Sequence, residues 1–299
     1  MYINPYGNLQ EGGGQWLKAN FHTHAGTGEG TCGAYKAEDV VALYKEAGYS
    51  VLTLSNHDFF LDAAELASRQ GMVTFNGFEY SQDLHMLCID VGKVFMGAHQ
   101  EVIDSCTEQE GFVILCHPNW IYKEYWPWEK IDKLKGYAGI EIYNGVISRL
   151  SGSGLATDTW DYLLSQGKLV WGFANDDFHR WYDLARTWNM IYTPSGEPGD
   201  IKDAILRGSF YASTGLVLNE MSVADGMVRV SAAAKDTYVT ECEYLFIGRE
   251  GKILGRQLDK HGEYRLKGDE PYIRVQVISE HGAMLWTQPV YRKELFEKP

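Results

Sequence analysis

Apolar runs of strand length, each leading to a histidine or an acidic residue, recur along most of this chain. Three of these pairs are residues 51–55 with His57, residues 112–116 with His117, and residues 169–173 with Asp177 and His179. Segments with apolar residues at helical spacing separate the runs. Strands that alternate with helices predict a mostly parallel sheet, and this many units in sequence favours a closed or nearly closed barrel.

The expected elements continue to about residue 210. The expected helices cover residues 37–47, 62–70, 99–108, 157–166 and 198–207, and the expected strands cover residues 51–55, 72–75, 86–91, 112–116, 139–144, 169–173 and 188–192. From about residue 216 onward, strand-like alternation is broken by turn signals such as Asp225-Gly226. We therefore expect a first domain over residues 1–215 and a small antiparallel, β-sandwich-like domain over residues 216–299, which could mediate oligomerisation.

The composition of the chain limits which partners it can bind and which cell compartment it suits. The net charge of -13 argues against a surface that tracks a long nucleic acid, because binding that backbone needs clustered cations. No apolar run is long enough to span a bilayer, and the N-terminal residues lack the apolar core of a signal peptide. The five cysteines are widely spaced and form no C-x-x-C pair. These features predict a cytoplasmic protein that does not bind membranes.

The histidines indicate a metal site. His22 and His24 point the same way if their segment is extended, because side chains alternate along a strand. Seven of the nine histidines lie in the first domain, and all but His99 are candidate donors; five of these six fall at or just after the end of an expected strand, counting the apolar-leaning run 16–21 before His22 and His24. In a parallel barrel those ends open on one face, so the side chains can converge. The predicted donors are His22, His24, Glu29, His57, Glu79, His85, His117, Asp177 and His179. Nine such donors without a thiolate suit two or three Zn, Mn or Fe ions.

The order of these motifs resembles that of the PHP (polymerase and histidinol phosphatase) superfamily of metal-dependent phosphoesterases. The matching segments are His22-Thr23-His24, Leu54-Ser55-Asn56-His57-Asp58, Gly77-Phe78-Glu79, His85-Met86-Leu87, Cys116-His117-Pro118 and Asp177-Phe178-His179. They occur in the family's order and cover roughly residues 17 to 215. Any one of them is a weak signal, but six in order are a strong one.

The resemblance implies a distorted (β/α)7 barrel that carries a trinuclear metal centre. It implies that His22, His24, Glu79 and Asp177 hold one ion, that Glu79 bridges to a second ion held by His85 and His117, and that His57 and His179 hold the third. The family often completes the third site with an Asp or His seven or eight residues after the first histidine. This chain has Glu29 there. It also has Asn56 where Asp is common, which would alter a contact behind the ligands.

The implied activity is hydrolysis of a small phosphorylated substrate, a phosphomonoester or a short nucleotide or diester. A hydroxide that bridges two ions would attack the phosphorus, because shared ions lower the pKa of water and neutralise phosphate oxygens. Glu79, Asp177 and His179 are the candidate catalytic residues. A cation beside the cluster would bind the phosphoryl group, and Arg180 is the first candidate, followed by Arg149 and Lys123.

Three other functions fit the same residues. A metallohydrolase could use the same chemistry on an ester or carbamate, because a polarised carbonyl needs the same Lewis acid. A polymerase-associated nuclease is a further alternative, which the acidic balance disfavours. A non-catalytic binding module, in which metals only stabilise the barrel, is the alternative outside enzymes.

Overall fold

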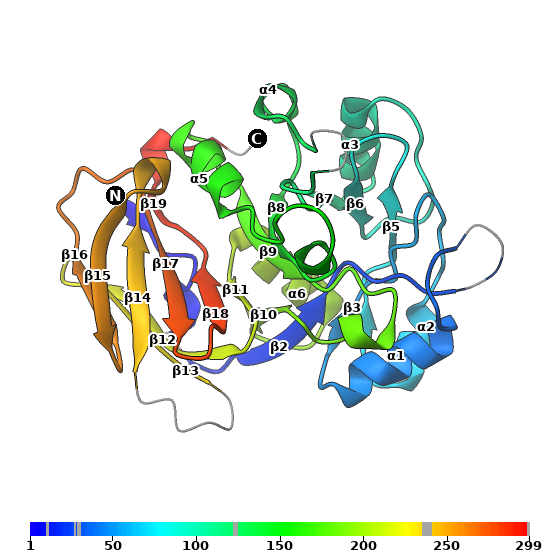
Figure 1. The fold of residues 1–299 in the computed structure, drawn as a ribbon, viewed down its shortest axis with the longest axis horizontal. Coiled ribbons are helices and arrows are strands. Elements are labelled where there is room, and N and C mark those ends of the chain that lie inside the picture. Colours follow the sequence, from blue (N-terminus) through cyan, green and yellow to red (C-terminus); the bar gives the residue numbers. More distant parts are fainter. Residues whose placement is uncertain (10–11, 27, 29–30, 122–124, 235–240, 298–299) are drawn as a thin grey trace. The chain divides into compact units, whose positions relative to one another are not determined.

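A computed structural model describes residues 1–299 except 10–11, 27, 29–30, 122–124, 235–240 and 298–299 (Figure 1). The chain forms two compact units that are interleaved along the sequence. Residues 17–159 and 173–189 form what we call the α/β unit, and residues 1–16, 160–172 and 190–298 form the β-rich unit. The division of function at residue 215, with a hydrolase before it and a β domain after it, stays a prediction.

The first part of the α/β unit is a parallel arrangement. Its strands are β2 (Gln15–Asn20), β3 (Val51–Leu52) and β4 (Val73–Thr74), and the helices between them are α1 (Ala37–Glu46) and α2 (Ala64–Arg69). β3 pairs in parallel with both neighbours. The apolar residues that predict α1 form its buried face, where Val40, Val41 and Tyr44 join one core cluster. Gly48 takes a positive φ of 82° just after α1, which few other residues adopt readily.

The second part of the α/β unit is a five-stranded mixed sheet. Its strands, in spatial order, are β5 (Gly77–Tyr80), β6 (Met86–Ile89), β7 (Phe112–Leu115), β8 (Gly139–Asn144) and β9 (Trp171–Asn175). Helix α3 (His99–Glu108) lies against β6 and β7 (Figure 1). The short helix α4 (Trp128–Ile131) precedes β8.

The direction of β6 corrects the expectation of a mostly parallel sheet. β6 pairs antiparallel with both β5 and β7, whereas β7 and β8 are parallel. Only residues 81–85 connect β5 to β6, which is too short for the crossover that a parallel pair needs. Because β6 is reversed, its first residue lies at the edge where β5 and β7 end. His85, which precedes β6, is thereby placed beside Glu79 and His117.

The β-rich unit is predominantly antiparallel, as the turn signals predict. One sheet of three strands contains β12 (Leu216–Ala224), β13 (Met227–Ala234) and β16 (Gly262–Arg265). The other strands of the unit are β1 (Tyr2–Ile3), β11 (Phe210–Ser213), β14 (Cys242–Ile247), β15 (Ile253–Asp259), β17 (Tyr272–Ser279), β18 (Met284–Thr287) and β19 (Val290–Arg292). β17 pairs antiparallel with β14, β18 and β19. The alternating apolar residues of these strands form one core cluster.

Three elements lie across or near the boundaries between the units. They are α5 (Thr157–Ser165), β10 (Trp188–Thr193) and α6 (Pro198–Arg207). Proline stands at the first position of α6 and Gly208 follows the helix with a φ of 77°, so both ends match the sequence prediction. The described residues form a mixed α/β structure with six α-helices. None of these helices has both the length and the apolar character required to cross a membrane.

A buried ion pair fixes the end of α5 within the β-rich unit. Asp161 accepts hydrogen bonds from Arg274 Nε at 2.7 Å and from the Tyr272 hydroxyl at 3.1 Å. Asp161 is 5% exposed and Arg274 is 2% exposed. Both charges are therefore removed from water, and each depends on the other for compensation.

We expect Asp161→Ala to destabilise the protein by about 3–5 kcal/mol, because it leaves the Arg274 guanidinium buried without its partner. Denaturant unfolding monitored by circular dichroism measures this change. The control is Glu243→Ala, which removes the solvent-exposed pair between Arg256 Nε and Glu243 Oε1 at 2.8 Å in the same unit. That substitution should lower the free energy of unfolding by less than about 1 kcal/mol. Equal effects of the two substitutions would contradict the importance assigned to burial.

Candidate metal centre

The segment that carries His22 and His24 is held against the segment that carries Asp177 and His179. Thr23 and Phe178 form a parallel bridge, in which the His24 N–H donates to the Phe178 carbonyl at 2.8 Å. Side chains alternate along an extended segment, so His22 and His24 lie on the side opposite Thr23. Residues separated by about 150 positions in the sequence are thereby brought to one place.

Glu79 lies at the centre of the histidines. Its Oε1 is 2.8 Å from His85 Nδ1 and 3.4 Å from His117 Nε2. Its Oε2 is 2.8 Å from His57 Nδ1 and 3.2 Å from His22 Nε2. The two oxygens therefore face different sets of rings, which is the arrangement that a carboxylate bridging two cations requires.

Asp177 is the second carboxylate of the cluster. Its Oδ1 lies 3.1 Å from His24 Nε2 and 3.2 Å from His22 Nε2. Asp177 has a positive φ of 55°, which is costly for a residue other than glycine. The unusual backbone directs the carboxylate towards the histidines rather than along the strand direction of β9.

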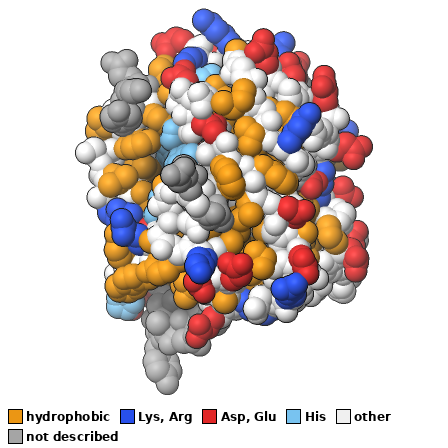
Figure 2. Space-filling view, turned by 90° about the vertical axis from the view of Figure 1, so that its right-hand side faces the viewer, with side chains coloured by type: hydrophobic (Ala, Val, Ile, Leu, Met, Phe, Trp, Pro, Cys, Tyr) orange, Lys and Arg blue, Asp and Glu red, His pale blue; other side chains and the backbone are white. Residues whose placement is uncertain are grey.

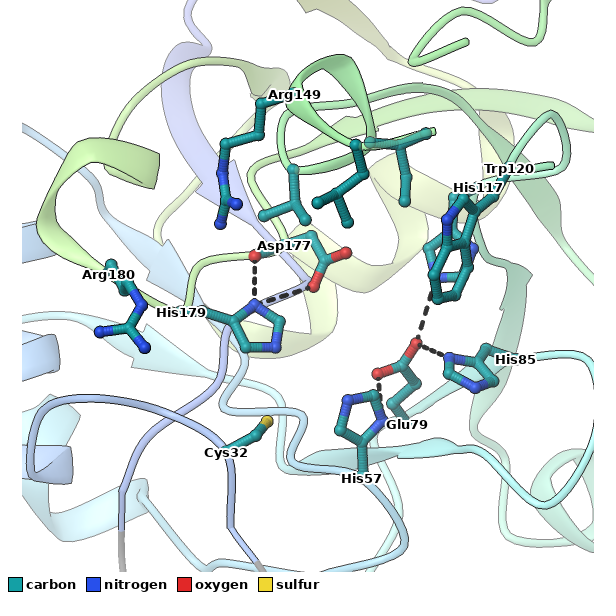
Figure 3. Close-up of a pocket in the computed structure, with 13 residues that line it drawn as sticks. Cys32, His57, Glu79, His85, His117, Trp120, Arg149, Asp177, His179 and Arg180 are labelled. Atoms are coloured by element: carbon teal, nitrogen blue, oxygen red, sulfur yellow. Dashed lines mark hydrogen bonds and ion pairs between the residues drawn. The ribbon is translucent and has the colours of Figure 1, made fainter. Parts of the chain in front are cut away.

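The structure brings together eight of the nine predicted metal ligands. These residues are His22, His24, His57, Glu79, His85, His117, Asp177 and His179. The ninth, Glu29, lies outside the described residues. Figure 3 shows members of this cluster around a pocket, and Figure 2 shows histidine side chains that reach the surface beside hydrophobic ones. The assignment of each residue to a particular ion stays a prediction.

Burial and close contact strongly perturb the charges of the cluster. Burial would raise the pKa of Glu79, but the rings of His57, His22 and His85 hold that pKa well below its usual range. Burial would lower the pKa of His22, but Asp177, Glu79 and Glu141 raise it well above its usual value. The carboxylates are therefore ionised and need positive charge nearby.

The donor atoms of the cluster fit divalent metal ions. His22 Nε2, both ring nitrogens of His24 and His117 Nδ1 are buried and have no hydrogen-bond partner among the described residues. Buried polar atoms are normally paired, and two of these nitrogens, His22 Nε2 and His24 Nε2, lie 3.1–3.2 Å from carboxylate oxygens, so the set suits cation binding. Imidazole and carboxylate donors suit Zn, Mn and Fe.

Cys32 also belongs to this cluster, although sequence reasoning did not select it. Its sulfur and ring nitrogens of His24, His57 and His179 all lie within 4.8 Å of one another. Burial would raise the pKa of Cys32, but His179, His24 and His57 lower it to about 4. The sequence signal that could have identified Cys32 as a member of the cluster is its position in the glycine-rich loop that follows His24.

Glu141 supports the cluster from behind. This buried carboxylate, on the third residue of β8, accepts hydrogen bonds from His22 Nδ1 at 2.8 Å and from the His117 backbone N–H at 2.8 Å. It also accepts from the side-chain amides of Asn144 and Asn175, at 2.9 and 3.0 Å. Because Glu141 binds Nδ1 of His22, it leaves Nε2 directed at Glu79 and Asp177.

The aromatic segment after His117 holds His85 in place. The backbone N–H of His85 donates to the Tyr125 hydroxyl at 3.0 Å, and Trp126 Nε1 donates to the backbone carbonyl of His85 at 3.1 Å. Trp120 packs edge-on to His117 with ring centroids 5.2 Å apart. These three aromatic residues therefore border the cluster as structural support.

A pocket of about 260 Å³ opens onto the cluster, and two of the three predicted cations line it. The Arg149 guanidinium points towards Asp177, whereas the Arg180 side chain extends away from the carboxylates (Figure 3). Asp183 accepts from Arg149 Nε at 2.9 Å and from Arg149 Nη2 at 3.1 Å. The geometry therefore favours Arg149 over Arg180. Lys123 lies outside the described residues.

Comparisons with known proteins show a shared fold. No family model and no curated protein matches the chain. A two-domain protein from Bacteroides vulgatus ATCC 8482, which contains a predicted PHP-like metal-dependent phosphoesterase, matches at 15% identity with a TM-score of 0.56, over 93% of this chain and 96% of that chain. The lesion-specific endonuclease PfuEndoQ from Pyrococcus furiosus matches at 13% identity with a TM-score of 0.49, over 78% of this chain and 62% of that chain. The predicted resemblance to PHP proteins is confirmed for the fold by the first match.

We expect Glu141→Gln to weaken metal binding by roughly 10–100-fold, because the amide nitrogen of glutamine cannot accept from His22 or from the His117 N–H. Competition with a chromogenic chelator measures the affinity. Glu108→Gln, at an exposed position, is the matched control and should leave the affinity unchanged. Unaltered affinity in Glu141→Gln with a normal circular dichroism spectrum would exclude this supporting role.

Proposed function

We propose that this protein is a metal-dependent phosphoesterase that hydrolyses a small phosphorylated substrate. The observation that carries the proposal is Glu79, whose two buried oxygens face separate groups of imidazoles. A bridging carboxylate of this kind suits two ions that act together on one phosphate. The fold shared with a two-domain protein that contains a predicted PHP-like phosphoesterase supports the same conclusion.

The finer architecture that we propose is a distorted (β/α)7 barrel within residues 1–215, followed by a β-sandwich-like domain over residues 216–299. The fold match, which spans nearly all of both chains, supports the arrangement of two domains. The antiparallel pairs among the strands that follow residue 216 support the second domain. We also propose that this β domain is available for oligomerisation and that the protein is cytoplasmic.

The proposed ligand sets are those that the resemblance to PHP proteins implies. One ion would be held by His22, His24, Asp177 and Glu79. A second ion would be held by Glu79, His85 and His117. A third ion would be held by His57 and His179. The close grouping of His22, His24 and Asp177 supports the first set, and the proximity of His57 to His179 supports the third. The contacts of Glu79 Oε1 with His85 and His117 support the second set. We propose two or three Zn, Mn or Fe ions.

The chemistry that divalent cations supply when bound is the activation of water near neutral pH and the neutralisation of phosphate oxygens. Glu79 and Asp177 orient the imidazoles and keep the charge of the centre balanced. His179 Nδ1 lies 2.8 Å from the Asp177 carbonyl, which can only accept, so Nδ1 carries the proton. In the neutral ring, His179 Nε2 is therefore the unprotonated nitrogen that remains for a metal ion.

The pocket suits a small substrate. Its volume of about 260 Å³ accommodates a phosphoryl group with a compact leaving group. Val146, Ile147 and Leu150 form an apolar wall beside the polar cluster. We propose that Arg149 binds the phosphate, since its guanidinium is held in the pocket by Asp183 and charge-assisted contacts to phosphate are strong.

Chelator treatment and His22→Ala should each abolish phosphate release from a panel of monoesters and short diesters, by about 100-fold or more, because both remove the ions. Phosphate release and elemental analysis are measured together. His281→Ala, at an exposed position in the β-rich unit, is the control and should change neither. If the metal-loaded protein released no phosphate from a broad panel, the proposal would fall. Cleavage of aryl esters or carbamates instead would support the alternative hydrolase.

Arg149→Ala should lower kcat/KM for a phosphomonoester by roughly 10–100-fold, because a charge-assisted hydrogen bond contributes about 1.5–3 kcal/mol. Arg149→Lys should recover part of this loss, since it keeps the charge but not the paired geometry. Arg180→Ala is the matched comparison and should have the smaller effect, since its side chain extends away from the carboxylates. A larger loss in Arg180→Ala would reverse the assignment.

A further inference from the structure

Cys32 places a sulfur donor inside the cluster, beside three imidazoles. Its Sγ points towards the space between His57 and His179 (Figure 3). The four donor atoms of Cys32, His24, His57 and His179 lie within 4.8 Å of one another, so one cation can reach them all. We infer that the thiolate of Cys32 is a ligand of the third ion, which makes this position a mixed nitrogen and sulfur site. The inference rests on the metal-binding part of the proposed function and not on phosphoester hydrolysis.

The ring nitrogens of His24 point independently to a ligand at this place. His24 is fully buried, and its Nδ1 has no hydrogen-bond partner among the described residues, whereas its Nε2 lies 3.1 Å from Asp177 Oδ1. His179 Nδ1 is occupied by the Asp177 carbonyl at 2.8 Å, so only Nε2 remains for binding. Three rings whose free nitrogens converge on one sulfur form a set of donors that a tetrahedral cation would satisfy.

Charge balance gives Cys32 a specific role. Imidazoles bind metal ions in the neutral form, so His24, His57 and His179 bring no negative charge to a divalent cation. Among the described members of this group, Cys32 is the only one that can be an anion. The predicted anion was Glu29, which lies outside the described residues. Cys32 therefore supplies the charge that the third position otherwise lacks.

A thiolate in this position changes which metal is preferred. Soft sulfur donors favour zinc, whereas manganese prefers carboxylate, carbonyl and water oxygens. The groups around Glu79 and Asp177 contain carboxylate oxygens, and the Cys116 sulfur that also lies near Glu79 is a buried thiol whose pKa burial raises well above its usual value. The group around Cys32 contains sulfur and no carboxylate. We therefore expect the third position to hold zinc or cobalt selectively and to discriminate against manganese.

Cobalt substitution of the full chain tests the inference, because cobalt bound to a thiolate shows a near-ultraviolet charge-transfer band. The metal-free protein is titrated with Co²⁺ alone. We expect the band in the wild type and in Cys116→Ser and its loss in Cys32→Ser. Zinc analysis should show that Cys32→Ser binds about one ion fewer. Glu29→Gln should keep the band, since it leaves the thiolate in place.

A thiol-labelling experiment provides a second readout that does not depend on activity. Cys32 is exposed, whereas Cys88, Cys106, Cys116 and Cys242 are buried. The folded metal-free protein should therefore show one rapidly labelled thiol, which Cys32→Ser removes. Stoichiometric Zn²⁺ should slow this labelling about tenfold or more, because a metal-bound thiolate is no longer free to react.

Two outcomes would overturn the inference. One is a charge-transfer band that is absent from the wild type or persists in Cys32→Ser. The other is a labelling rate that does not depend on metal, together with a zinc content that does not depend on Cys32. Both would have to be found in protein with a normal circular dichroism spectrum. A protein that shows the band but cleaves no phosphoester would refute the proposed function and leave the thiolate ligand established.

Discussion

The burial of the Glu79 carboxylate is the constraint on which the rest of the site depends. Glu79 is fully buried, and an isolated carboxylate in such a place costs several kcal/mol. Without metal, the surrounding rings must provide the balancing charge. Burial would lower the pKa of His57, but Glu79 and Cys32 raise it to about 11. Divalent cations would balance the same carboxylate without protonating the rings, so metal binding and folding are linked in this unit.

The chain meets this constraint by ending strands at one place and by bending the backbone there. Asp58, His117 and Asp177 have positive φ values of 45°, 32° and 55°, in a region that residues other than glycine seldom adopt. Such conformations cost of order 1–3 kcal/mol each and persist where the surroundings hold them. The Asp58 side chain, for example, accepts from the Ser81 N–H at 3.0 Å. Three of the nine described non-glycine residues with positive φ thus lie at or next to a ligand.

Much of the site follows from the sequence, because histidines at the ends of apolar runs must meet if those ends share an edge. Helix α1 follows from its periodicity and from Gly48 after it, and the start of helix α6 follows from Pro198. The direction of β6 could not be predicted, because an apolar run has the same pattern in both directions and only the short connection before it reveals the reversal. Cys32 lay in a loop without periodicity, and the direction of the Arg149 side chain depends on Asp183, a contact that sequence spacing does not encode.

Under the proposed function, the net charge of the chain and the local charge of the site act in opposite directions, and together they would favour a small substrate over a long one. The net charge of -13 repels an extended polyanion at long range. Inside the pocket, two bound divalent ions would outweigh the carboxylates of Glu79 and Asp177, and Arg149 adds a further positive charge. Bound cations are the largest local charges in such a site, so they determine the sign that a phosphate meets there. A small phosphorylated molecule would reach that field, whereas a long nucleic acid would also meet the long-range repulsion of the net negative charge.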